Sequence, residues 1–379
     1  MKNILFFIES LGGGGAEKVL CEIVKNIDKD KFNITVRTIT DNGRYDNEVA
    51  KYCTVYSCLK AKDYNAGGIR KLIYQMKYYL IYHLPAKIIN LIYIKRDADI
   101  QIAFVEGYAT KVISVGNKKK QKIAWVHVDP IERNYADMYF SSLKKQKSLY
   151  QRFEKIVCVS NSVSNSFEKK FGLSNKIITI YNPINKIEII KRSLDSKKIE
   201  EKKDGKLKFI SVGRLEMQKG YDRLIEAFST VSKESYELRI LGEGSLKEKL
   251  ESEIELYGLK ENIYLLGFQE NPYKYMMDAD VFICSSRAEG YSLVIAEAMV
   301  LGLPIITTNC SGPDELVENG KYGIMVDNSL EGIRAGISQV INNEERIKEL
   351  RELSKQRSEF FSMKSTINEI ENILLGECI

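Results

Sequence analysis

The chain has 379 residues, of which 44% are hydrophobic and 28% charged, a composition that excludes a disordered protein and a length that allows two domains. Residues 1–186 carry 31 Lys and Arg against 17 Asp and Glu, whereas the remainder carries 26 against 34, so the net charge of +6 conceals a basic first half. Such a half suits nucleic acid or an anionic membrane surface, and no segment approaches the roughly 18 apolar residues that a spanning helix needs.

The first apolar run predicts a buried strand. Residues 4–8 are apolar and Glu9 follows, so the run is too short for a convincing signal peptide. A loop that contains Gly13 and Gly14 then leads into a helix. A strand, a glycine loop and a helix suit close approach of the backbone to a phosphate or a sugar, and a flexible turn is the alternative.

A dinucleotide-binding loop is a weaker alternative at the same position. It requires G-x-G-x-x-G and an acidic residue at the end of the second strand. Asp41 does follow the second strand, but Ser10, Gly12 and Gly15 supply only two of the three glycines. The spacing therefore argues against a dehydrogenase.

Residues 68–96 are rich in Tyr, Ile, Leu and Lys, and basic residues are interleaved with aromatic and aliphatic ones. This pattern is typical of a helix that lies in a membrane interface. Two ordinary packed helices, broken near Pro85, explain it equally well. The basic run 118–122 adds to the same positive field.

The strand at 123–130 ends in His127 and Asp129, and the chain has only two histidines. A histidine at the end of a strand usually has a packing role, and Asp129 is a candidate for deprotonating an acceptor. Residues 185–206 are polar and charge-rich, which predicts a linker. We therefore expect a first domain over 1–184 and a second over 207–359.

The second half restarts with a strand that ends at Gly213, followed by Arg214 and Lys219. Two cations between a strand and a helix suit a diphosphate because they offset its charge, although a surface ion pair is the usual role of one cation. Gly242 and Gly267 follow the next two predicted strands.

Residues 279–309 read as strand, loop, helix and strand, and the rest of the chain is organised around them. Ser292 can cap the helix. Glu289 lies in the loop, and Glu297 lies within an apolar stretch of the helix, where a carboxylate needs a partner. The amides from Gly290 to Leu293 form a helix start that suits an anion.

Glu289, seven intervening residues and Glu297, followed by Gly302-Leu303-Pro304, resemble the E-x7-E signature of family-4 retaining glycosyltransferases, the group-1 glycosyl transferases. The resemblance spans nearly the whole chain and is strongest from 208 to 325. It implies an α/β protein of the GT-B fold, with two doubly wound Rossmann-like domains, an inter-domain cleft, and a last helix at about 360–379 that packs back on the first domain.

The resemblance also implies the site. In the family, the residues that match Glu297, Glu289 and His127 hold the ribose, the donor sugar and the far edge of that sugar. The expected catalytic residues are His127, Arg214, Lys219 and Glu289. The residues expected around the donor are Gly13, Gly14, Gly213, Gly242, Gly267, Phe268, Gly290, Tyr291, Ser292, Leu293 and Glu297.

The implied reaction transfers a sugar from a nucleoside-diphosphate sugar, with UDP favoured, to a hydroxyl of a glycan acceptor with retention. No cofactor, metal or nucleic acid is expected. The basic, aromatic first half favours a polyprenyl-diphosphate-linked acceptor of capsule, exopolysaccharide or lipopolysaccharide synthesis, and a cytoplasmic protein on the inner face of an anionic membrane. An epimerase or phosphorylase of the same architecture and a non-catalytic sugar-nucleotide-binding subunit are the alternatives.

Overall fold

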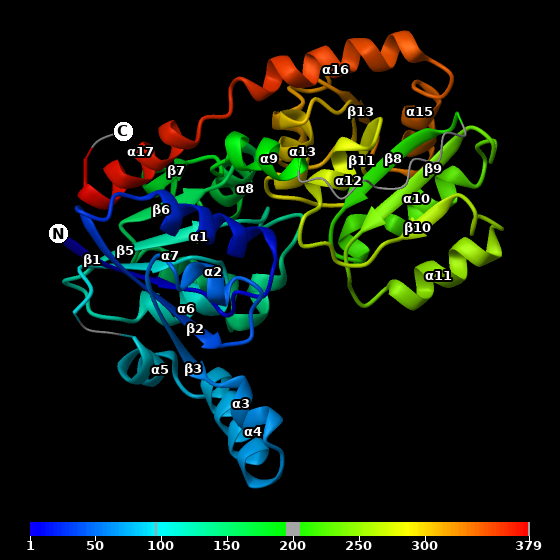
Figure 1. The fold of residues 1–379 in the computed structure, drawn as a ribbon. Helices are drawn as coiled ribbons and strands as arrows, with labels where there is room; N and C mark the ends of the chain where they lie inside the picture. Colours follow the sequence, from blue (N-terminus) through cyan, green and yellow to red (C-terminus); the bar gives the residue numbers. More distant parts are fainter. Residues whose placement is uncertain (95–96, 195–204, 378–379) are drawn as a thin grey trace. The chain divides into compact units, whose positions relative to one another are not determined.

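Residues 1–94, 97–194 and 205–377 are described by the computed structural model of the chain. The chain forms two compact units (Figure 1): Met1–Pro183 with Lys364–Ile379, and Ile184–Met363. Each unit is built on one parallel sheet whose strands alternate with helices along the chain. The expected α/β class with two Rossmann-like sheets is confirmed.

The first unit holds a seven-stranded sheet in the order β3-β2-β1-β4-β5-β6-β7, with all neighbours parallel. Its central strands are almost continuously apolar, as in sheets that helices cover on both faces. The strands are β1 (Lys2–Phe7), β2 (Phe32–Thr40), β3 (Thr54–Leu59), β4 (Ile100–Ala103), β5 (Gln121–Val126), β6 (Lys155–Cys158) and β7 (Ile177–Thr179). The helices are α1 (Gly15–Asn26), α2 (Asp46–Val49), α3 (Ala61–Asn65), α4 (Gly68–His83), α5 (Ala86–Tyr93), α6 (Tyr108–Ser114), α7 (Leu143–Tyr150), α8 (Asn161–Phe171) and α17 (Met363–Leu375).

Helices α4 and α5 occupy the segment that is rich in Tyr and Lys. The break near Pro85 is confirmed, because α4 ends at His83 and α5 begins at Ala86. Ile81 is the one buried residue of α4, and α3 and α4 project away from the sheet of the first unit (Figure 1). Residues 95 and 96 lie outside the described part of the chain.

The second unit holds a six-stranded parallel sheet in the order β10-β9-β8-β11-β12-β13. Its core gathers aliphatic and aromatic side chains from the strands and from α10, α11, α15 and α16. The strands are β8 (Leu207–Val212), β9 (Tyr236–Leu241), β10 (Ile263–Leu265), β11 (Val281–Cys284), β12 (Ile305–Thr308) and β13 (Ile324–Val326). The helices are α9 (Lys186–Ser193), α10 (Tyr221–Phe228), α11 (Lys247–Leu256), α12 (Tyr273–Met277), α13 (Leu293–Val300), α14 (Pro313–Leu316), α15 (Leu330–Ser338) and α16 (Glu344–Ser358).

The expected linker at 185–206 differs from the structure. Its first part forms helix α9, because the side chain of Asn185 caps the helix by accepting from the amide of Glu188 at 3.1 Å. Residues 195–204 lie outside the described residues.

Helix α17 belongs to the first unit, although α9 to α16 lie between it and β7 in the sequence. The buried carboxylate of Glu371 accepts from the amide of Asp28 at 2.8 Å and pairs with Lys31 at 3.2 Å. The ammonium of Lys2 donates to the carbonyl of Leu374 at 2.9 Å. Residues from the two ends of the first unit's sequence therefore fold together.

Candidate active site

The strand order singles out one place in each sheet. In the second unit the chain adds β9 and β10 on one side of β8 and then places β11 on the other side. Where the order of an open parallel sheet reverses in this way, ligands bind at the carboxyl ends of the strands. The loops at that place, 213–220 after β8 and 285–292 after β11, contain most of the residues expected at the site.

The two loops are held together by hydrogen bonds. The amide of Arg287 donates to the carbonyl of Gln218, and the side-chain amide of Gln218 donates to the carbonyl of Ala288, both at 2.7 Å. The guanidinium of Arg287 also binds both carboxylate oxygens of Asp222, at 2.8 and 2.7 Å. This bidentate pair fixes the loop after β11 against the first turn of α10.

Lys219 and Glu289 form an ion pair between these loops. The Lys219 ammonium lies 2.6 Å from Oε1 of Glu289, and the Ser286 hydroxyl donates to the same oxygen at 2.7 Å. Their side chains are only 17% and 9% exposed. Burial alone would lower the pKa of Lys219, but the carboxylate of Glu289 raises it above its ordinary value. Lys219 therefore stays charged.

Three expected glycines lie side by side at the ends of β8, β9 and β10. The amide of Gly242 donates to the carbonyl of Gly267 at 2.8 Å, and a Cβ on Gly242, where φ is +145°, would meet the carbonyl oxygen of Gly213 at 1.9 Å. A Cβ on Gly213 would lie 2.9 Å from both Cε of Lys219 and the hydroxyl of Tyr221. Because these glycines have no side chains, the ends of the strands can lie close together, and Lys219 has room for its side chain.

The other expected residues of the second unit lie at the same edge of the sheet. Arg214 is exposed and lies in the same loop as Lys219. Phe268 follows β10 and is 43% exposed. Gly290 and Tyr291 are buried, and Leu293 is half-buried at the start of α13.

Glu297 lies in α13 and Ser292 directly precedes this helix, and the cap expected from Ser292 is wrong. Glu297 is buried in α13. The Ser292 side chain makes no capping hydrogen bond, and its hydroxyl is buried without a hydrogen-bond partner among the described residues. A buried hydroxyl without a partner at the start of a helix is available to bind a ligand.

His127 lies in the first unit, directly after β5. Its amide donates to the Glu106 carboxylate at 2.9 Å, and its ring contacts Phe104 with centroids 4.9 Å apart. Burial lowers the pKa of the imidazole to about 3, despite a hydrogen bond to the Phe104 backbone that acts in the opposite direction. The imidazole is therefore neutral at physiological pH, and its buried Nε2 has no partner among the described residues.

The suggestion that Asp129 deprotonates an acceptor is not supported by its contacts. Its buried carboxylate accepts from the amides of Ile131 and Glu132 at 2.8 and 3.0 Å and from the Ser166 hydroxyl at 2.5 Å. These are contacts of a carboxylate that holds a turn.

Gly13 and Gly14 lie where the strand order of the first sheet reverses, between β1 and β4. Gly13 has a φ of +114°, and Gly14 precedes the first residue of α1. The glycine loop thus lies at the kind of place where parallel sheets bind ligands, and its contact with a ligand stays a prediction.

Sequence reasoning missed two carboxylates at this edge. Glu106 is buried and accepts from the amide of His127 and the hydroxyl of Tyr135. Glu9 accepts from the Tyr82 hydroxyl at 2.8 Å. Burial raises the pKa of both. The signal was available, because each acid follows a buried apolar strand closely.

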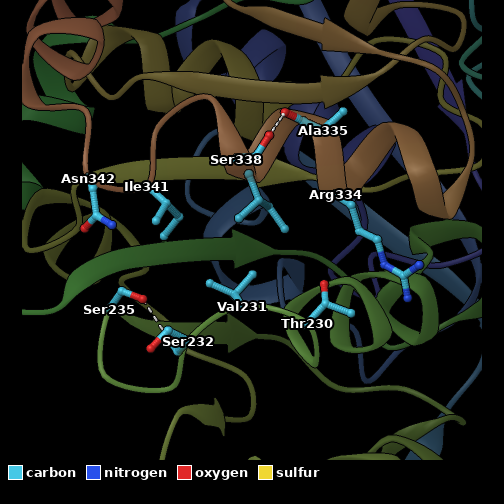
Figure 2. A pocket seen from close by; sticks show the side chains of 10 residues that line it. Thr230, Val231, Ser232, Ser235, Arg334, Ala335, Ser338, Ile341 and Asn342 are labelled. Atoms are coloured by element: carbon cyan, nitrogen blue, oxygen red, sulfur yellow. Dashed lines mark hydrogen bonds between the residues drawn. The ribbon is translucent and has the colours of Figure 1, made fainter.

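The other candidate sites in the structure have weaker support as binding sites. A hollow of about 510 Å³ lies near the turn 230–235 and α15, and Figure 2 shows the side chains that line it. It lies at the amino end of β9, away from the glycines, and the hydroxyls of Ser235 and Ser338 donate to backbone carbonyls. Within the described residues there is no cluster of three or more acidic, Cys or His side chains suited to a metal, and no helix long and apolar enough to cross a membrane.

Two family models match the chain. Residues 13–186 match the model described as Glycosyltransferase Family 4, and residues 193–357 match Glycosyl transferases group 1. Together they cover every strand of both sheets except β1. The chain belongs to the family-4, group-1 glycosyltransferases, and it is a glycosyltransferase. The family resemblance stated from the E-x7-E pattern is confirmed.

Individual relatives agree. The chain is 27% identical to N-acetylgalactosamine-N,N'-diacetylbacillosaminyl-diphospho-undecaprenol 4-alpha-N-acetylgalactosaminyltransferase of Campylobacter jejuni, across 99% of this chain and 100% of that protein. It is 30% identical to the capsular polysaccharide biosynthesis glycosyltransferase CapM of Staphylococcus aureus, across 50% of this chain and 52% of CapM. The crystal structure of Anabaena HepE with UDP and glucose superposes with a TM-score of 0.76 at 18% identity, over 99% of each chain. The GT-B fold is confirmed.

The buried ion pair predicts a large coupling between its partners. Lys219→Met leaves the Glu289 carboxylate buried without its cation, which should destabilise the second unit by about 3–5 kcal/mol in urea unfolding. Adding Glu289→Gln should restore most of this loss, because no charge then remains. Lys249→Met removes a solvent-exposed pair and should change little. Additive effects of the two substitutions would contradict the pairing.

The lowered pKa of His127 predicts an imidazole that does not titrate near neutral pH. In a ¹H–¹³C NMR titration from pH 8 to pH 5, its ring signals should stay those of the neutral form. The chain has one other histidine, and His83→Gln assigns the spectrum. A His127 midpoint near 6.5, its ordinary value, would show that the ring is solvated.

Proposed function

We propose that this enzyme transfers a sugar with retention from a UDP-sugar to a hydroxyl of a lipid-linked glycan in surface polysaccharide synthesis. The observation that carries the donor part is the charged Lys219, held between two loops where the strand order reverses. HepE, which shares the fold, was solved with UDP and glucose. Fold alone does not fix a substrate, so the donor needs its own test.

Breaking the anomeric carbon–oxygen bond places negative charge on the departing diphosphate. Lys219, the exposed Arg214 and the amides of 290–293 at the start of α13 are the groups that we assign to that charge. Glu297 is assigned to the ribose and Glu289 to the donor sugar. The neutral imidazole of His127 is assigned to the same sugar, which it can bind without adding charge.

Retention follows if the acceptor attacks the face from which the diphosphate leaves. The alternative, a covalent glycosyl-enzyme, needs a carboxylate that is available as a nucleophile. Oε1 of Glu289 already accepts from Lys219 and Ser286, which makes this carboxylate a weak nucleophile. In the proposed route the acceptor hydroxyl passes its proton to the leaving phosphate oxygen.

The donor is tested by thermal stabilisation with UDP-, GDP-, ADP- and TDP-sugars. A UDP-sugar at one hundred times its dissociation constant should stabilise the protein by about 2.7 kcal/mol. Arg214→Ala and Glu297→Ala should remove the shift. Arg334→Ala, which lines the hollow in Figure 2, should retain it. Preference for another nucleotide would overturn the uridine assignment, and an undiminished shift in Arg214→Ala would overturn the diphosphate site.

The lipid-linked acceptor is supported by the outer surface of α4 and α5. Large apolar side chains that point to solvent there include Ile69 at 77% exposure, Leu72 at 66% and Met76 at 55%. The chain has no acidic residue from 64 to 96, and the described part of that segment contains four Lys and Arg. Apolar side chains with basic neighbours fit the headgroup region of an anionic bilayer. The C. jejuni relative is named for a diphospho-undecaprenol acceptor, which such a bilayer would carry.

Liposome flotation tests the membrane part. The protein should float with vesicles that contain phosphatidylglycerol and much less with pure phosphatidylcholine. Ile69→Gln, Leu72→Gln and Met76→Gln together should abolish flotation. Leu256→Gln, equally exposed in the second unit, should not. Equal binding of the triple variant would exclude this surface as the membrane contact.

A further inference from the structure

The projecting helix α4 has a second face, lined with tyrosines. Tyr74, Tyr78 and Tyr82 are four residues apart and therefore share one side of the helix. Their rings form a continuous row with neighbouring elements: Tyr64 and Tyr74 are 5.4 Å apart, Tyr74 and Tyr78 6.5 Å, and Tyr78 and Tyr82 5.0 Å. We call Tyr64, Tyr74, Tyr78 and Tyr82 the tyrosine row.

The row runs from the projecting helices to the sheet. At its inner end Tyr82 meets Tyr108 at 4.6 Å, and Tyr108 meets Tyr139 at 5.8 Å. The Tyr82 hydroxyl donates to Glu9, which follows β1. Because β1 lies where the strand order of the first sheet reverses, the row ends at the place where this sheet is expected to bind a ligand.

The row is not an ordinary core. A helix on a globular protein normally turns its aliphatic residues inward, yet the aliphatic residues of α4 point to solvent, with the exception of Ile81. Tyr64 and Tyr78 keep 42% and 43% of their surface exposed. The rings of Tyr64 and Tyr78 thus remain accessible on the side of α4 that carries the row, while the aliphatic residues of the same helix form the surface that we assign to the membrane.

Two buried polar atoms at the same edge lack partners. Nε1 of Trp125 and Nε2 of His127 have none among the residues that the structure describes, and Trp125 is only 3% exposed. Trp125, Phe104 and His127 form one aromatic cluster, and the backbone of His127 is bound to Glu106, whose charge acts on Glu9. A buried indole N–H and a buried imidazole nitrogen without partners point to a polar ligand.

We infer that the tyrosine row and Glu9 bind the sugar rings of the acceptor, an inference that rests on the proposed glycan acceptor. Sugars present C–H faces that pack on aromatic rings, and hydroxyls that donate to carboxylates. Several rings in a row suit an oligosaccharide rather than a single sugar. The row continues from the surface that we assign to the bilayer, so a lipid-linked chain can be held along it.

The test uses the whole protein and the methyl glycosides and disaccharides of glucose, galactose, N-acetylglucosamine and N-acetylgalactosamine. Saturation-transfer NMR should detect binding of at least one of them. Tyr74→Leu with Tyr78→Leu should weaken that binding about tenfold, whereas Tyr74→Phe with Tyr78→Phe, which keeps the rings, should retain most of it. Glu9→Gln should also weaken it. Tyr56→Leu removes a tyrosine of similar exposure outside the row and should leave binding unchanged.

UDP-sugar stabilisation, measured on the same variants, separates this inference from the proposed function. It should survive in every row variant, and a circular dichroism spectrum and melting temperature equal to those of the wild type show that the leucine variants are folded. If the donor stabilises the protein but no glycoside binds, or if the leucine and wild-type proteins bind glycosides equally, the tyrosine row is not the acceptor site. The donor site is unaffected by either result. Loss of liposome flotation alone in the leucine variants would assign the row to lipid instead of sugar. Absence of donor stabilisation in the wild type would overturn the proposed function itself.

Discussion

The parallel sheets of this protein restrict where its functional side chains can lie. Helices cover parallel sheets on both faces, so the strands themselves are mostly apolar. Polar side chains must gather in the loops at the strand ends, and only a reversal of strand order opens two neighbouring loops. Both units obey this rule: β8 and β11 present Lys219 and Glu289, and β1 and β4 are followed by Glu9 and Glu106.

The Lys219–Glu289 pair joins the two loops at the reversal of strand order in the second unit. Without the pair, either charge would be buried alone at a cost of several kcal/mol. With the pair, the Lys219 ammonium is fixed in position, and Gly213, which has no side chain, leaves room for the side chain of Lys219. A diphosphate that reaches Lys219 competes with Glu289 for its protons, so donor binding would release the carboxylate toward the sugar. Arg287 and Asp222 keep the two loops aligned through this exchange.

The sequence predicts well what depends on neighbours along the chain. The strand, loop, helix and strand at 279–309 were found because apolar runs, a Gly-containing loop and a helix stop are local signals, and β11, α13 and β12 confirm them. The break near Pro85 has the same local origin. Ser292 occupies the N-cap position, but its side chain makes no hydrogen bond to the helix amides, and no local rule specifies whether that bond forms.

What the sequence did not reveal depends on distant partners. Glu106 matters because it meets His127 and Tyr135, which are 21 and 29 residues away, and Arg287 because it meets Asp222, 65 residues away. Asn185 and Lys186 look like linker residues by composition, yet a helix forms there. The expected role of His127 came from the resemblance, since a single histidine carries no signature of its own.

The return of α17 to the first unit affects the order in which the protein can fold. Lys2, near the beginning of the chain, can bind the carbonyl of Leu374 only after more than 370 further residues have been synthesised. Residues 184–363 are complete before that moment and are free to fold as a unit. During synthesis the first unit therefore stays unfinished longest, with the surface that α17 will cover still open to chaperones.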